Sequence, residues 1–147
     1  MNTPLPKGDW IRAISIKQPW VTAILTGQKT VENRGRDQWP WRGLLLLHAS
    51  QSLDRPALRH PLVATTVRGR ELVTGAVVSV ARLIDCHRDA DGVPPCTPWS
   101  ELGAVHLVLR DVQELALPVP ALGRLGLWKP SEDLLTQVLQ QLPDLRP

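Results

Sequence analysis

The sequence contains no phenylalanine and no tyrosine, so tryptophan supplies all six aromatic side chains. It has only two cysteines, Cys86 and Cys96. Two cysteines cannot staple a domain of 147 residues, and we expect them to be reduced structural thiols. These absences exclude the class of small disulfide-rich secreted proteins.

Long apolar runs are absent as well. The densest run, residues 44–47, is far too short to cross a bilayer. The first nine residues contain two prolines and no apolar stretch, and so do not resemble a signal peptide. We therefore expect a soluble, cytoplasmic protein with no membrane partner.

Lysine is scarce, because arginine supplies 13 of the 17 cationic residues in a chain of net charge +3. The planar guanidinium group suits phosphates and stacked bases, which favours a nucleic-acid partner. Trp39 and Trp41, next to Arg42, could form a stacking wall for bases. A biased genome whose proteins are generally rich in arginine, proline, alanine and leucine would give the same composition. Both interpretations stay open.

The length fits one hydrophobic core, so we expect a flexible tail at 1–9 and a single domain at 10–147. The apolar patterns predict strands at 10–16, 29–34, 43–48, 75–86 and 104–112, and an edge-like extended segment at 117–120. Residues 59–72 are expected to form a loop with a helical turn, and residues 89–98 a surface loop.

Three helices are predicted. The first begins at Pro19, which suits the first helical position, and ends at Gly27, which permits a left-handed stop. The second covers 53–58, with Ser50 and Ser52 before it as caps, and the third covers 131–142, capped by Ser131. This order of elements predicts an α+β fold of five to six mostly antiparallel strands curled into a small barrel, with two to three helices at its rim.

One block of sequence stands out. Gln18-Pro19-Trp20 is followed by a segment running from Gly27 through Lys29 and Glu32 to Arg34. A lysine, a glutamate and an arginine fixed within six residues are costly to bury and to order. Such a cluster therefore indicates a charged or strongly polar partner.

This block closely resembles the signature of the ASCH domain. Arg42-Gly43-Leu44, the stretch from Gly75 to His87, and Gly123-x-x-Gly126-Leu127-Trp128 agree with the same family, so the resemblance covers about 14–128. It implies a barrel of the PUA-like type with a cleft for RNA, single-stranded nucleic acid or a modified nucleoside. The resemblance places Lys29, Glu32 and Arg34 in that cleft.

The resemblance also implies a possible enzymatic activity, since some relatives in this family deacetylate N4-acetylcytidine or cut RNA. If this chain is an enzyme, Lys29 and Glu32 are the catalytic candidates. The deacetylating branch, however, has a threonine at the position where this chain has Glu32. Its pattern also includes a glutamate further along the chain, and here only the order of residues suggests Glu71 for that position. Binding is therefore favoured over an amidohydrolase or metal-independent ribonuclease, and a protein-interaction adaptor is a third possibility.

Strand alternation puts Thr30, Glu32 and Arg34 on one face and Lys29 on the other. We expect Glu32 and Arg34 to form a pair, while Lys29 swings from the turn and offers its ammonium group to a phosphate or base carbonyl. The alternative is a weak surface salt bridge. The remaining candidates for ligand contact are Trp20, Trp41, His48, Ser50 and Arg124.

A zinc site built from Asp85-Cys86-His87 and Cys96 was considered. Adjacent side chains diverge on a strand, and a Cys-x9-Cys spacing fits no common zinc pattern. The sequence therefore predicts no metal and no cofactor, and it says nothing of protein partners.

Overall fold

The computed structural model describes residues 9–35, 38–90 and 92–147, so the predicted tail at 1–9 lies outside the described residues except for Asp9. The strands are β1 (Ile11–Gln18), β2 (Val31–Arg34), β3 (Gly43–Leu53), β4 (Ala76–His87), β5 (Val105–Pro120) and β6 (Leu127–Trp128). The helices are α1 (Trp20–Leu25), α2 (Pro61–Thr66) and α3 (Glu132–Gln141), with a 3-10 turn η1 (Pro56–Arg59).

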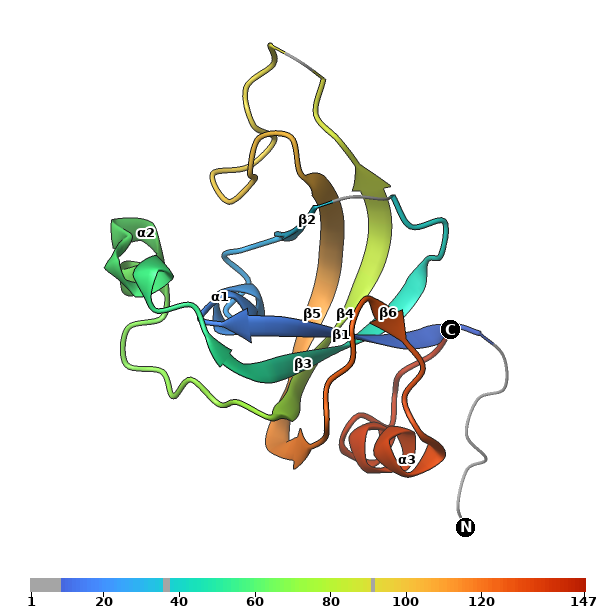
Figure 1. The fold of residues 1–147 in the computed structure, drawn as a ribbon. Coiled ribbons are helices and arrows are strands. Elements are labelled where there is room, and N and C mark those ends of the chain that lie inside the picture. Colours follow the sequence, from blue (N-terminus) through green and yellow to red (C-terminus); the bar gives the residue numbers. More distant parts are fainter. Residues whose placement is uncertain (1–8, 36–37, 91) are drawn as a thin grey trace.

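The six strands form one mixed sheet in the order β2-β5-β4-β3-β1-β6. In Figure 1 the long strands β4 and β5 run across the direction of β1 and β3, so the sheet curls into a half-barrel. This confirms the predicted α+β class and its mostly antiparallel strands. One pair differs, because β1 and β3 are parallel and are connected through α1 and β2.

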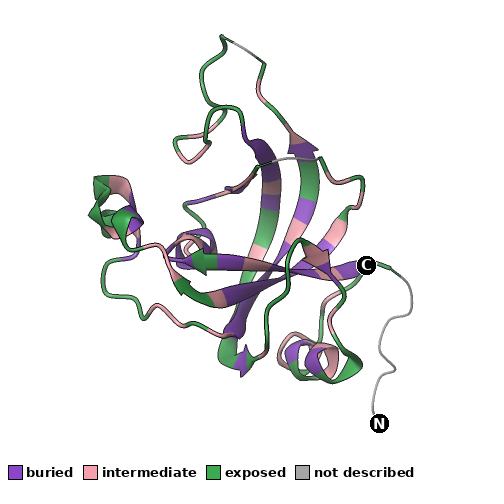
Figure 2. Cartoon of the chain, in the orientation of Figure 1, coloured by how far each residue is buried: buried purple, intermediate pink, exposed green. Residues whose placement is uncertain are grey.

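Hydrophobic clusters cover both faces of the central strands. Leu45 and Leu47 pack on one face with Ile24 of α1. Leu44 and Leu46 pack on the other with Val138 of α3. This double burial explains why the run at 44–47 does not alternate, and Figure 2 shows the buried colour along the strands of the sheet.

Helix α1 is held by the residues of the first sequence block. Pro19 precedes the helix as its N-cap residue, and the buried Gln18 side chain accepts the Thr22 N–H at 3.1 Å, which satisfies a donor of the first turn. Gly27 has φ +84, the left-handed conformation predicted for the stop. The Gln-Pro motif thus fixes the direction in which the chain leaves β1.

Two predicted elements differ from those observed. β3 continues to Leu53, so no helix is capped by Ser50 and Ser52; the short η1 turn follows instead, where Asp54 Oδ1 accepts the Ala57 N–H at 3.3 Å. The predicted strand at 104–112 and extended segment at 117–120 form one strand, β5. The loop predicted at 59–72 contains α2, while α3 is capped by Ser131 as expected.

No helix of the described residues is long and apolar enough to cross a membrane.

Gly43→Ala should destabilise the fold, because an added Cβ would lie 2.5 Å from the Trp10 carbonyl oxygen, at a residue with φ +154. We expect a loss of about 1–3 kcal/mol in the free energy of unfolding, measured by urea denaturation. Gly35→Ala is the control, since its Cβ would meet nothing within 4 Å. Equal stability of both variants would contradict the close approach of β3 to Trp10.

Candidate functional site

A cleft of about 800 Å³ opens where β1, β2 and β3 meet two loops. Strand residues supply one side of it, and the loops at 99–101 and 124–126 supply the rest. The lining residues are Ser15, Ile16, Lys17, Trp20, Lys29, Glu32, Asn33, Arg34, Ser50, Ser52, Asp54, Trp99, Ser100, Glu101, Arg124, Leu125 and Gly126.

Lys29 lies at the floor of this cleft and is only 1% exposed. Its Nζ donates to the Val31 carbonyl oxygen at 2.5 Å and to Glu32 Oε1 at 3.0 Å. The ammonium also lies 5.7 Å from the centroid of the Trp20 ring. Lys29 therefore holds the Glu32 carboxylate in place, rather than projecting a free ammonium group toward solvent.

Arg34 closes the same cluster from β2. Its Nη2 lies 3.8 Å from Glu32 Oε2 and donates to the Ser15 carbonyl oxygen at 3.0 Å. Its Nε is buried and has no hydrogen-bond partner among the described residues. Glu32 thus contacts both cations, the shorter contact being the one with Lys29. The free Nε is a donor that an anion or water in the cleft would satisfy.

Two tryptophans flank the cleft. Trp20 and Trp99 meet edge to face, with ring centroids 6.5 Å apart. Trp20 Nε1 donates to Asp54 Oδ2 at 2.9 Å, which fixes the ring. Trp99 is held through its backbone, because its carbonyl oxygen accepts from Asn33 Nδ2 at 2.9 Å. Both rings are half-buried, so part of their surface faces the cleft.

The structure brings six of the predicted site residues to the cleft: Trp20, Lys29, Glu32, Arg34, Ser50 and Arg124. Thr30 lines a separate depression beside Arg110. Trp41 packs against the core, and its Nε1 donates to the Asp9 carbonyl oxygen at 2.6 Å. Neither Thr30 nor Trp41 lines the cleft.

His48 also lies outside the cleft but supports one of its walls. The buried imidazole contacts the Ala121 carbonyl oxygen through Nε2 at 2.7 Å and Ser15 Oγ through Nδ1 at 3.0 Å. Ser15 Oγ in turn accepts the Arg124 backbone N–H at 3.3 Å. A Cβ on Gly123 would lie 2.7 Å from the His48 ring, so glycine allows this loop to settle on the imidazole. His48 thereby positions the loop that carries Arg124.

Several lining residues were missed by sequence reasoning. Lys17, Ser52 and Asp54 lie near the ends of strands, and their polar type alone gave no signal. Trp99 and Glu101 lie just after the surface loop predicted at 89–98, in a segment for which no element was predicted. The available signal was a tryptophan beside a proline-rich loop, but only folding brings it to Trp20.

Of the residues weighed for zinc in the sequence, His87 and Cys96 lie close together, whereas Cys86 lies apart from them. Cys86 is buried in the core, and its Sγ accepts the Trp39 N–H at 3.2 Å. Cys96 is exposed and lies in the connection between β4 and β5.

These features define the class of protein: it is a curled α+β half-barrel with a polar cleft at its strand ends, flanked by two tryptophans. The sequence matches the family model of the ASCH domain over residues 14–118. The chain therefore belongs to the ASCH domain family, as its sequence motifs predicted.

The fold is similar to solved structures of an ASCH protein from Zymomonas mobilis. One structure is 16% identical with a TM-score of 0.59, covering 90% of this chain and 98% of that chain; it is a mutant form. Another is 15% identical with a TM-score of 0.57, covering 89% of this chain and 94% of that one. At this identity the likeness shows the fold alone. A comparison with curated proteins gave no match.

Lys29→Met should destabilise the protein strongly, because it leaves the Glu32 carboxylate buried without its closest cation. We expect the free energy of unfolding to fall by about 3–5 kcal/mol, measured by chemical denaturation. Lys17→Met is the control, since Lys17 lines the same cleft but is exposed, and it should change stability by less than about 0.5 kcal/mol. A stable Lys29→Met protein would instead support the sequence-based expectation of a free ammonium.

Proposed function

We propose that the cleft binds single-stranded nucleic acid, with RNA as the first ligand to test. The observation that carries this proposal is the presence of exposed or half-exposed cations and two tryptophan rings in one cleft. Cationic groups attract the phosphate backbone, and aromatic rings stack with unpaired bases.

The charges in the cleft support this use. Lys17, Arg34 and Arg124 line it, and the exposed Arg124 guanidinium group has no hydrogen bond or ion pair with a described residue. Two of the three carboxylates that line the cleft are engaged, because Glu32 pairs with Lys29 and Asp54 accepts from Trp20, whereas Glu101 is exposed. The remaining cations are therefore available to a phosphate.

The size and shape of the cleft favour a flexible strand over a duplex. A volume of about 800 Å³ is in the range of small-molecule sites, enough for a nucleotide and part of its neighbour. Trp20 and Trp99 meet edge to face, so an unstacked base could lie on one ring while the backbone follows Arg34 and Arg124.

Arg124→Ala should weaken binding of a short, labelled single-stranded RNA, measured by fluorescence anisotropy over a series of salt concentrations. Each phosphate contact contributes about 0.7 to the slope of log K against log salt for a single strand, so we expect the slope to fall by about this amount. Arg110→Ala is the matched control, because Arg110 is an exposed arginine of β5 that does not line the cleft.

Equal losses in the two arginine variants, or binding that does not depend on salt, would contradict phosphate recognition in the cleft. The nucleosides cytidine and N4-acetylcytidine serve as competitors. Displacement of the RNA by a nucleoside alone would assign the site to a modified base rather than to a strand.

A hydrolytic reaction in the same cleft is the second candidate. The contact between Lys29 and the Glu32 carboxylate favours it, because a carboxylate held by a cation in a cleft could act as a general base toward water. Incubation with N4-acetylcytidine and with single-stranded RNA, followed by chromatography, tests it. A product that the unchanged protein forms and the Glu32→Gln variant does not would establish hydrolysis. If the unchanged protein forms no product, only the binding function is left.

A further inference from the structure

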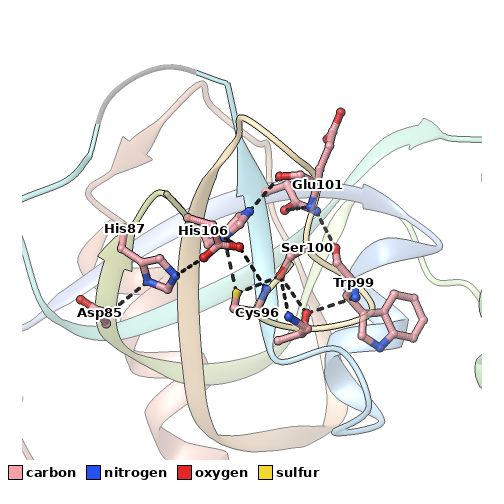
Figure 3. Close-up of polar contacts among 10 residues, drawn as sticks. Asp85, His87, Cys96, Trp99, Ser100, Glu101 and His106 are labelled. Atoms are coloured by element: carbon pink, nitrogen blue, oxygen red, sulfur yellow. Dashed lines mark hydrogen bonds and ion pairs between the residues drawn. The ribbon is translucent and has the colours of Figure 1, made fainter. Parts of the chain in front are cut away.

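Four side chains with metal-binding atoms converge at one end of the half-barrel (Figure 3). His87 ends β4, and His106 lies directly opposite it on β5. The connection between the two strands folds back and adds Asp89 and Cys96. One potential ligand atom from each residue lies within 4.8 Å of those of the other three. This cluster is separate from the cleft at Lys29.

The individual separations are close to those of a tetrahedral site. His87 Nε2 lies 3.1 Å from Asp89 Oδ1, and His106 Nδ1 lies 3.5 Å from both Asp89 Oδ2 and Cys96 Sγ. Ligands about 2.0–2.3 Å from a tetrahedral zinc ion lie about 3.3–3.8 Å from one another. A small contraction of the widest separation would complete this geometry.

The outer hydrogen bonds orient both imidazoles toward the centre of the cluster. His106 Nε2 lies 2.9 Å from the Glu101 carbonyl oxygen, which can only accept, so Nε2 carries the proton and Nδ1 has a lone pair. His87 Nδ1 lies 3.0 Å from Asp85 Oδ2 and can donate its proton there, which leaves Nε2 to bind a metal. Imidazoles that bind metals are typically held by such carbonyl and carboxylate partners.

A metal cation would balance these groups. When each ring keeps its proton on the outer nitrogen, the two inner lone pairs face the Asp89 carboxylate, and a positive charge between them would stabilise this arrangement. The Cys96 N–H donates to Asp89 Oδ2 at 3.0 Å, which holds this carboxylate within the cluster. The Ser100 hydroxyl lies 3.0 Å from Cys96 Sγ, where it can donate to a thiolate.

We propose that His87, Asp89, Cys96 and His106 bind one zinc ion. A thiolate and a carboxylate carry two negative charges, which match a divalent ion when the two imidazoles are neutral. The mixed set of sulfur, nitrogen and oxygen ligands suits zinc, whereas magnesium and calcium prefer oxygen alone. Four protein ligands leave no open position, so the ion is structural.

The ion would fasten the loop that forms one wall of the cleft. Trp99, Ser100 and Glu101 follow Cys96 directly and line the cleft. Asn33 of β2 joins the same loop, because its Oδ1 accepts the Glu101 N–H at 2.9 Å. Zinc would thus order Trp99 for stacking; this consequence rests on the proposed nucleic-acid function, but metal binding itself does not.

Zinc binding by the full chain is measured in two ways. Elemental analysis of protein purified without chelator should give one zinc per chain, and titration of chelator-treated protein against a zinc-sensitive dye should give the affinity. Cobalt added in place of zinc should give a thiolate charge-transfer band and the visible spectrum of a four-coordinate ion.

The variants Cys96→Ser and Asp89→Asn should lose the bound metal, and Cys96→Ser should also lose the charge-transfer band. Cys86→Ala is the matched cysteine control and His60→Gln the histidine control; both should keep one equivalent. Asp85→Asn removes only the outer partner of His87, so it should weaken affinity about 10–100-fold without abolishing binding. Circular dichroism confirms that each variant is folded.

Protein without bound zinc that also takes up none in the titration would overturn the proposal. Equal loss of metal from Cys86→Ala and Cys96→Ser would do the same. The RNA assay distinguishes this proposal from the proposed function. A protein that binds zinc but no RNA would overturn only the nucleic-acid function. A protein that binds RNA but no zinc would overturn only the metal site.

Discussion

The parallel pairing of β1 with β3 is the contact on which the rest of the structure depends. Both strands are covered on both faces. Helix α1 and one part of the sheet cover one face, and helix α3 and another part of the sheet cover the other face. Because β1 pairs with β3 on one side and β6 on the other, its backbone is held on both sides. β1 carries Ser15, which holds the Arg34 and Arg124 walls of the cleft through its carbonyl and hydroxyl oxygens.

The buried pair of Lys29 and Glu32 gives the signature segment a different role from the one its charges suggested. A lysine that is 1% exposed cannot present its ammonium group to a phosphate without leaving the core. It instead neutralises Glu32, so the cleft can hold a carboxylate close to Arg34 without repelling an anionic ligand. Exposed residues outside this segment, Lys17 and Arg124, then remain as the cations that the proposed ligand would contact. The family signature therefore reflects the construction of the cleft as much as ligand contact.

Much of the fold could be predicted from local patterns. The Gln-Pro start and Gly27 stop define α1, Ser131 caps α3, and the valine-rich stretch forms β4, because each of these signals acts within a few residues. The extent of β3 and β5 could not be predicted. Serines after His48 suit a helix start as well as a strand, and prolines at 118 and 120 suggested a separate segment. In both cases the pairing partner decided, since β1 pairs with the end of β3 and β4 pairs with β5 as far as Pro120.

The sequence alone determined the family, the α+β class, and the presence of Lys29, Glu32 and Arg34 at one turn and strand. Tertiary structure decided which of these charges is buried, and it brought Trp99 to Trp20 and His106 to His87. The physical reason is distance along the chain. Lys29 and Glu32 are neighbours on one segment, whereas Trp99 and Trp20, and the side chains clustered around Asp89, are brought together by the pairing of distant strands. A pattern of residue types records the first kind of contact and carries no information on the second.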